Sequence, residues 1–171
     1  MLPLDSERWN ELVSFFGTPA DVTRAIAHWR EACGFDQEWD IYSGELFQPY
    51  LHQGTITSIA YAVVPWVVHT LQSQVVQHPE QYLIDVATVE LNRLEYGTYY
   101  PRGIPGETPP SWLAEDYARA IQDAAQLAED LLDTELSAGD RHALWQVLPA
   151  LFGNARAAEE RLNEEAPDSR D

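Results

Sequence analysis

Residues 46–79 contain no Asp, Glu, Lys or Arg, although such residues make up 22% of the chain. The most apolar part of this stretch, residues 56–76, is long enough to span a bilayer, which takes roughly 20 residues. However, polar residues such as Thr70 and Gln72 interrupt it, and it lacks basic flanks that would set an orientation. We therefore expect a helix that is buried on most sides in the middle of a helical domain.

Apolar residues recur at three- and four-residue spacings along nearly the whole chain, which is typical of amphipathic helices. The sequence predicts an all-α fold of about seven to eight antiparallel helices, with a single domain over residues 1–165 and a frayed acidic tail over residues 166–171. No strand is expected, since residues 96–100 are the only candidate and Gly and Pro surround them. The expected helices are residues 5–16, 19–33, 37–51, 55–76, 78–95, 111–133, 140–152 and 154–165.

Several residues are typical of helix ends. Thr18 before Pro19 indicates an N-cap followed by proline at the first helical position. Ser111 is the expected cap of the sixth helix. Gly54 is expected to end the third helix in a left-handed conformation, and Thr55 is expected to cap the fourth. The segment His52-Gln53-Gly54-Thr55 is therefore interpreted as the turn between two helices rather than as a ligand or proton-transfer site.

A weak internal repeat favours one helical architecture. Pro149 lies 84 residues after Pro65, and apolar residues surround both prolines. This offset is about twice the period of HEAT or armadillo repeats, in which paired helices stack into a curved surface. A short HEAT/armadillo-like stack is therefore the predicted architecture, with a nonrepetitive helical bundle as the alternative.

The segment LFQPYLHQGTIT at residues 46–57, followed by AYAVVPWVV at residues 60–68, resembles a signature of bacterial HEAT-like proteins. In that signature a helix ends in His-Gln-Gly-Thr, and the next helix carries an interior Ala-x-x-x-Pro. Some helical-repeat proteins of this kind are thought to be immunity proteins for polymorphic toxins. The resemblance implies a helical-repeat fold and a toxin partner, and it implies no catalytic residues.

The charge of the chain restricts its partners. All ten basic residues are arginine, against 28 acidic residues, which gives a formal charge of −18. Such a protein repels nucleic acid and anionic membranes and attracts basic protein surfaces. The N-terminus lacks the pattern of a signal peptide, so a cytoplasmic location is expected. The single cysteine, Cys33, cannot form an internal disulfide.

No catalytic or metal-binding motif is apparent. No two histidines have the i, i+4 spacing that places two imidazoles on one helix face, and no Gly-x-Ser-x-Gly or phosphate-binding glycine motif occurs. Asp85 with Glu90, or Glu90 with Glu95, could form an acid–base pair, but nothing fixes their separation and surface carboxylates of one helix are the ordinary explanation. The sequence therefore predicts neither a cofactor nor a metal, and it favours a protein that is not an enzyme.

Two segments are candidates for partner binding. The sixth helix carries Asp116, Asp123 and Asp130 seven residues apart along one edge, either as a docking strip for basic residues or as an ordinary solvated face. The loop around Tyr99, Tyr100 and Arg102 is rich in the residue types of interface hot spots, although its tyrosines could instead pack on neighbouring helices. A further acidic pair, Glu38 and Asp40, is a secondary candidate.

These features predict an acidic binding protein that occludes a basic partner, most plausibly an immunity protein for a toxin that acts on nucleic acid or a nucleotide. The alternatives are a helical-repeat scaffold or adaptor, a nucleic-acid-mimicking regulator of a DNA-binding protein, and an enzyme. A scaffold would have several weak partners, DNA would displace the partner of a nucleic-acid mimic, and an enzyme would turn over nucleotides or phosphoesters.

Overall fold

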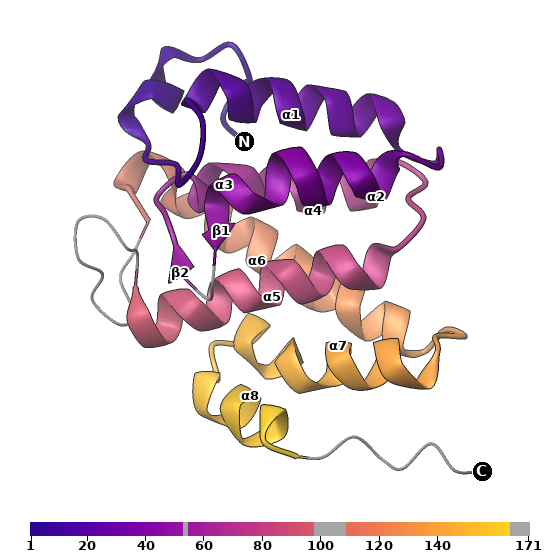
Figure 1. The fold of residues 1–171 in the computed structure, drawn as a ribbon. Helices are drawn as coiled ribbons and strands as arrows, with labels where there is room; N and C mark the ends of the chain where they lie inside the picture. Colours follow the sequence, from indigo (N-terminus) through magenta and orange to yellow (C-terminus); the bar gives the residue numbers. More distant parts are fainter. Residues whose placement is uncertain (53–54, 98–108, 165–171) are drawn as a thin grey trace.

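The computed structural model describes residues 1–52, 55–97 and 109–164, and in these ranges the chain is all-α apart from one pair of two-residue strands. The predicted fold class is therefore confirmed. Figure 1 shows the helices running from α1 at one end of the molecule, through α4 and α5, to α7 and α8 at the other. The elements are the 3₁₀ helix η1 (Glu7–Glu11), α1 (Pro19–Ala32), α2 (Glu38–Ile41), the π-helical segment η2 (Tyr42–Phe47), α3 (Gln48–Tyr50), β1 (Leu51–His52), β2 (Thr55–Ile56), α4 (Ala60–Ser73), α5 (Pro79–Tyr96), α6 (Ser111–Leu132), α7 (Ala138–Leu151) and α8 (Ala155–Leu162).

Helix α4 is the buried centre that the uncharged stretch predicts. Every residue from position 60 to position 68 is buried, and His69 is the first exposed position. The Thr70 hydroxyl satisfies its hydrogen bond inside the helix by donating to the Trp66 carbonyl at 2.8 Å. Within the described ranges, no helix is both long enough and apolar enough to cross a membrane.

The connection into α4 differs from the prediction. Thr55 does not cap a helix, because it pairs with His52 in the antiparallel ladder of β1 and β2, and Leu51 pairs with Ile56. Helix α4 begins only at Ala60. The strand pair forms in place of an earlier helix start because it buries the side chains of both Leu51 and Ile56.

The first predicted helix shortens to the 3₁₀ helix η1. The Trp9 indole donates to the Pro3 carbonyl at 2.9 Å, and the Val13 amide donates to the Ser58 hydroxyl at 2.8 Å. The Trp9 bond is local, whereas the Val13 bond reaches a distant segment, as do the bonds from the Phe15 amide to the Pro49 carbonyl and from the Ile59 amide to the Val13 carbonyl. These bonds use backbone groups that a longer helix would need, and they hold the N-terminal segment against the chain that leads into α4.

The third predicted helix is divided into α2, η2 and α3. Pro49 has no amide hydrogen to donate to the carbonyl of Glu45, so a regular α-helix cannot continue through this point. The chain widens to a π-helix over Tyr42–Phe47 before it reaches the proline. This segment places Tyr42 and Tyr50 in the core with their hydroxyls hydrogen-bonded to each other.

The predicted helix caps are partly confirmed. Thr18 and Asp21 form a reciprocal capping box at the start of α1, with Pro19 at the first helical position. Ser111 is not a cap, because it is already the first residue of α6. The carbonyl of Pro110 closes that first turn by accepting from the amides of Leu113 and Ala114.

The two interior prolines occupy different places in their helices. Pro65 lies in the first half of α4, whereas Pro149 lies in the last turn of α7. The 84-residue offset therefore does not align equivalent parts of two helices, and a HEAT-like repeat stays a prediction.

An aromatic cluster joins the N-terminal helices to α5. The rings of Trp29, Trp39 and Tyr42 all lie near Tyr82, and Tyr42 meets it edge-on with 4.5 Å between ring centroids. Helix α7 then packs on α5, α6 and α8. This packing places α2, the start of α5 and the start of α7 around one side of the molecule.

Candidate partner-binding surface

All eight arginines in the described residues contact another group of the same chain. Four pair with a carboxylate on the same helix, three lie over a tryptophan ring, and one donates to backbone carbonyls. The arginines paired with carboxylates are Arg24, Arg93, Arg119 and Arg156. Those over tryptophan rings are Arg8, Arg30 and Arg161, and the one that donates to carbonyls is Arg141. Four of the positive charges are thus paired with carboxylates, and with a formal charge of −18 the charge offered to a partner is predominantly negative.

The structure brings the three predicted aspartates of α6 to the flank of the helix that faces α4. Asp116 and Asp123 line one hollow of about 200 Å³ together with His69 of α4, and Asp130 lines a second hollow of about 200 Å³. Asp116 pairs with the N-terminal amine of Met1, so part of its charge is compensated. Asp123 has no ion pair within the described ranges. The three aspartates therefore lie on one surface, but they differ in whether another charged group of the molecule pairs with the carboxylate.

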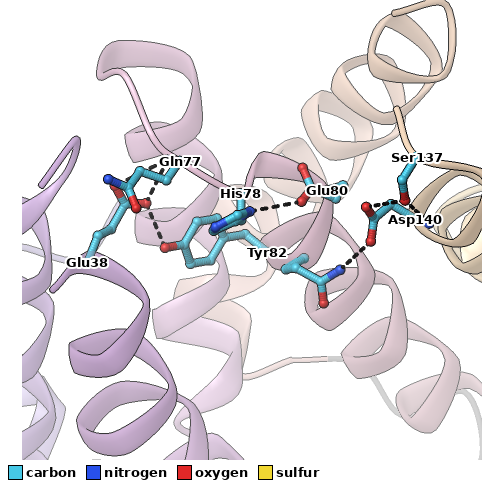
Figure 2. Close-up of polar contacts among 8 residues, drawn as sticks. Glu38, Gln77, His78, Glu80, Tyr82, Ser137 and Asp140 are labelled. Atoms are coloured by element: carbon cyan, nitrogen blue, oxygen red, sulfur yellow. Dashed lines mark hydrogen bonds and ion pairs between the residues drawn. The ribbon is translucent and has the colours of Figure 1, made fainter. Parts of the chain in front are cut away.

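Glu38 was predicted to contact a partner, and that prediction is wrong because the side chain is fully buried. Its carboxylate accepts hydrogen bonds from the Gly34 amide at 2.6 Å, the Gln77 amide at 3.2 Å and the Tyr82 hydroxyl at 2.6 Å. Figure 2 shows the bonds to Gln77 and Tyr82. Glu38 thus ties the turn after α1 to the connection between α4 and α5. Its neighbour Asp40 is exposed, as expected.

The predicted contact loop with Tyr99, Tyr100 and Arg102 lies outside the described residues, so its role stays a prediction. At its N-terminal edge, Gly97 ends α5 with a positive φ of 66°, a conformation that glycine adopts without strain.

A polar pocket of about 330 Å³ lies where α2, α5 and α7 meet. Trp39, His78, Glu80, Gln81 and Asp140 line it. Figure 2 shows its two polar groups: His78 beside Glu80, and Asp140 hydrogen-bonded to Ser137 and to the glutamine that follows Glu80. The sequence does not predict this pocket, because its residues come from three distant segments and form no motif.

A larger groove of about 680 Å³ runs between α1 and the η2–α3 segment. His28 and Glu45 approach each other across it, with 3.2 Å between ring nitrogen and carboxylate oxygen. Asp21 at its edge already pairs with Arg24. Because both of its acids already contact basic side chains of the molecule, this groove is less suited to a basic partner than the polar pocket.

Burial affects the three acids on α5 that the sequence singles out, and for two of them it raises the pKa. It raises the pKa of Asp85 to about 7, although a hydrogen bond from the Tyr42 hydroxyl acts in the opposite direction. Burial and the neighbouring Glu159 of α8 raise the pKa of Glu95 to about 7. Glu90 is buried, and it accepts hydrogen bonds from Arg93 at 2.7 Å and from Tyr117 at 2.8 Å. Glu90 is therefore a buried, hydrogen-bonded residue and not a surface carboxylate.

The Cys33 thiol is half-buried and donates to the Trp29 carbonyl at 3.4 Å. Burial raises its pKa to about 11, so the thiol stays protonated at neutral pH and is a poor nucleophile. Within the described ranges, no three His, Cys, Asp or Glu side chains gather as metal ligands would.

Comparison of the chain with protein families, with curated proteins and with solved structures found no match.

Proposed function

We propose that this protein is an acidic binding protein that neutralises a basic protein partner by occlusion, and that the partner is a bacterial toxin acting on nucleic acid or a nucleotide. The observation that supports this most is the asymmetry of the surface charge. All eight described arginines have partners inside the molecule, whereas carboxylates such as Asp40, Asp123 and Glu129 reach solvent with no ion pair in the described part of the chain.

The α6 flank is the proposed docking strip. Its carboxylates occupy successive double turns of a rigid helix, so they present negative charge at regular intervals, as a phosphate backbone does. A cleft that is basic because it binds a polyanionic substrate would attract this strip and be blocked by it. Charges of this kind mainly accelerate association, so a tight complex also needs a buried contact.

The assignment of the partner as a toxin depends on the resemblance of residues 46–57 and 60–68 to bacterial HEAT-like proteins, some of which are thought to be immunity proteins. The charge asymmetry by itself supports only the coarser proposal of a binding protein for a basic partner.

The test is affinity capture from a lysate of the source organism at low and at high salt, with the bound proteins identified by mass spectrometry. We expect one stoichiometric basic partner that survives high salt and whose activity on nucleic acid or nucleotides the complex suppresses. A broad set of proteins that all elute with salt would refute the proposal, because it would show that the charge only solubilises the chain.

The triple variant Asp116→Asn/Asp123→Asn/Asp130→Asn tests the docking strip. Its matched control is Glu7→Gln/Glu11→Gln/Asp36→Asn, which removes the same charge from exposed positions elsewhere. We expect the α6 variant to associate with the captured partner about tenfold more slowly at low salt and the control to do so much less. Equal slowing in both variants would mean that only net charge matters and that α6 is not the docking strip.

A further inference from the structure

The polar pocket between α2, α5 and α7 combines two carboxylates with an aromatic side chain. Glu80 comes from the first turn of α5, Asp140 from the first turn of α7, and Trp39 from α2. At about 330 Å³, the pocket is near the lower end of the range for sites that enclose a small ligand. The composition favours a single cationic group.

Glu80 is the least satisfied of the polar groups in this pocket. Its side chain is nine-tenths buried, yet it accepts no hydrogen bond from the described residues. Its one close contact is the ring of His78 at 3.4 Å, which is an ion pair only when that half-exposed ring is protonated. By contrast, Glu38 accepts from three donors. Because Glu80 lines the pocket and each carboxylate oxygen has more than one lone pair, it has capacity to accept hydrogen bonds from a ligand.

Asp140 is held in place on the other side of the pocket. Its two oxygens accept from Gln81 at 3.2 Å and from the Ser137 hydroxyl at 2.6 Å, and these bonds fix its position while its charge stays uncompensated by any cation in the described ranges. The carboxylate can accept further hydrogen bonds, since each oxygen has more than one lone pair.

Trp39 supplies the aromatic wall. Three other tryptophans of this chain, Trp66, Trp112 and Trp145, each carry an arginine guanidinium 4.3–5.1 Å from the ring centroid. Trp9 and Trp29 are sealed in the core. Trp39 is therefore the one partly exposed tryptophan that has no arginine from the described part of its own chain. Contacts with Tyr42 and Tyr82, each at 5.7 Å between centroids, fix its ring in place.

We infer that this pocket binds the guanidinium group of an arginine side chain from the basic partner. The planar guanidinium stacks on the Trp39 indole as arginines do on the other three tryptophans, and its fork of N–H donors supplies the hydrogen bonds that Glu80 lacks. Arginine fits better than lysine because its guanidinium is more weakly hydrated and bonds two acceptors in one plane. That the arginine belongs to a protein partner rests on the proposed function, whereas guanidinium binding itself does not.

The first experiment measures guanidinium binding to the full-length protein without any partner. N-acetyl-arginine amide is titrated into labelled protein while the indole N–H signal of Trp39 is followed by NMR, with N-acetyl-lysine amide and the uncharged N-acetyl-citrulline amide as comparison probes. We expect a saturable shift with a dissociation constant on the order of 1 mM for the arginine probe, weaker binding of lysine and none of citrulline. No saturable shift, or an equal response to citrulline, would overturn the inference.

Glu80→Gln tests the carboxylate, with Glu11→Gln, at an exposed position of η1 outside both the pocket and the α6 strip, as the matched control for loss of one charge. We expect Glu80→Gln to weaken binding of the arginine probe about tenfold or more and the control to leave it unchanged. Glu80→Gln should still fold, because it leaves no strong hydrogen bond broken, and a thermal melt checks this. Asp140→Asn is a second variant on the opposite wall, with the same expected direction. Equal binding in the wild-type protein and both pocket variants would contradict the assignment.

The partner captured under the proposed function then decides where the arginine comes from. Glu80→Gln should accelerate dissociation of that complex, whereas the α6 triple variant should mainly slow association. If Glu80→Gln abolishes arginine binding but leaves the complex unaffected, the pocket does not serve the partner and the inference fails while the proposed function stands. If no partner is captured at all, the proposed function fails and the arginine titration still decides whether the pocket binds guanidinium.

Discussion

The carboxylates in the core and those on α6 have the same chemistry, but the core carboxylates are hydrogen-bonded within the fold and the α6 carboxylates lie at its surface. Glu38 and Glu90 are buried and satisfied: the first accepts from two amides and a tyrosine, the second from an arginine and a tyrosine. Asp116, Asp123 and Asp130 lie at the surface beside shallow hollows, with few bonds to the rest of the molecule.

This difference teaches that the net charge of a chain does not show which of its acids bind a partner. A buried carboxylate with several donors stabilises the fold and has no capacity left for a ligand. An exposed carboxylate contributes little to the fold and keeps that capacity. Glu80 belongs to neither group, since it is largely buried but lacks the donors of Glu38, and this combination is why we propose it as a binding residue.

The largest expected effect on folding comes from Glu38→Ala. The variant removes the acceptor of three hydrogen bonds and leaves the Gly34 and Gln77 amides and the Tyr82 hydroxyl without it, so the free energy of unfolding should fall by about 3 kcal/mol. Urea denaturation at pH 7 measures this. The exposed neighbour Asp36→Ala is the control and should change stability by less than about 0.5 kcal/mol. If both variants are equally stable, the contrast between buried and exposed acids is wrong.

Asp85→Asn should give a smaller effect of opposite sign. The pKa of Asp85 is raised from 3.8 to about 7, so the folded protein holds a proton that the unfolded chain releases, and this group favours folding less as pH rises from about 4 to 7. Asparagine stays neutral and still accepts from Tyr42. We expect the variant to be more stable than the wild type by about 1–2 kcal/mol at pH 8 and equal to it near pH 4.

The measurement is urea denaturation of both proteins at pH 4.5 and pH 8, with Asp36→Asn as a control whose difference from the wild type should not depend on pH. A stability difference for Asp85→Asn that is the same at both pH values would show that Asp85 ionises as freely as a surface aspartate.

The smallest expected effect on stability is that of the α6 triple variant. Replacing Asp116, Asp123 and Asp130 with asparagine removes one pair with the N-terminal amine and one exposed hydrogen bond to Gln126, so the free energy of unfolding should change by less than about 1 kcal/mol. A thermal melt at low salt checks this. A loss as large as that of Glu38→Ala would mean that the strip is part of the scaffold, and slower association of this variant could no longer be attributed to docking.

Local rules of sequence predicted much of the fold. Helix α1 forms where Thr18 and Pro19 indicate, because helix capping depends only on residues within about one turn. Helix α4 is buried as its composition predicts, since an uncharged apolar helix is stable in water only inside a core. The common flank of the α6 aspartates follows from their spacing of seven.

The predictions failed where distant segments compete with local preference. In the expected helix at residues 5–16, the Val13 and Phe15 amides bond to Ser58 and to the Pro49 carbonyl instead, and Thr55 lies in a strand pair rather than at a helix cap. Glu38 is buried because α1, the α4–α5 connection and α5 converge on it, which no window of sequence shows.

The sequence by itself therefore determined the all-α class, the buried central helix, the acidic charge and the row of aspartates on α6, because each depends on composition or on spacing along one helix. Only the tertiary structure decided which acids are sealed in the core and which remain available. It also created the pocket of Trp39, Glu80 and Asp140, whose residues come from three helices. The solvation of a carboxylate depends on everything packed around it, and most of those neighbours are distant in the chain.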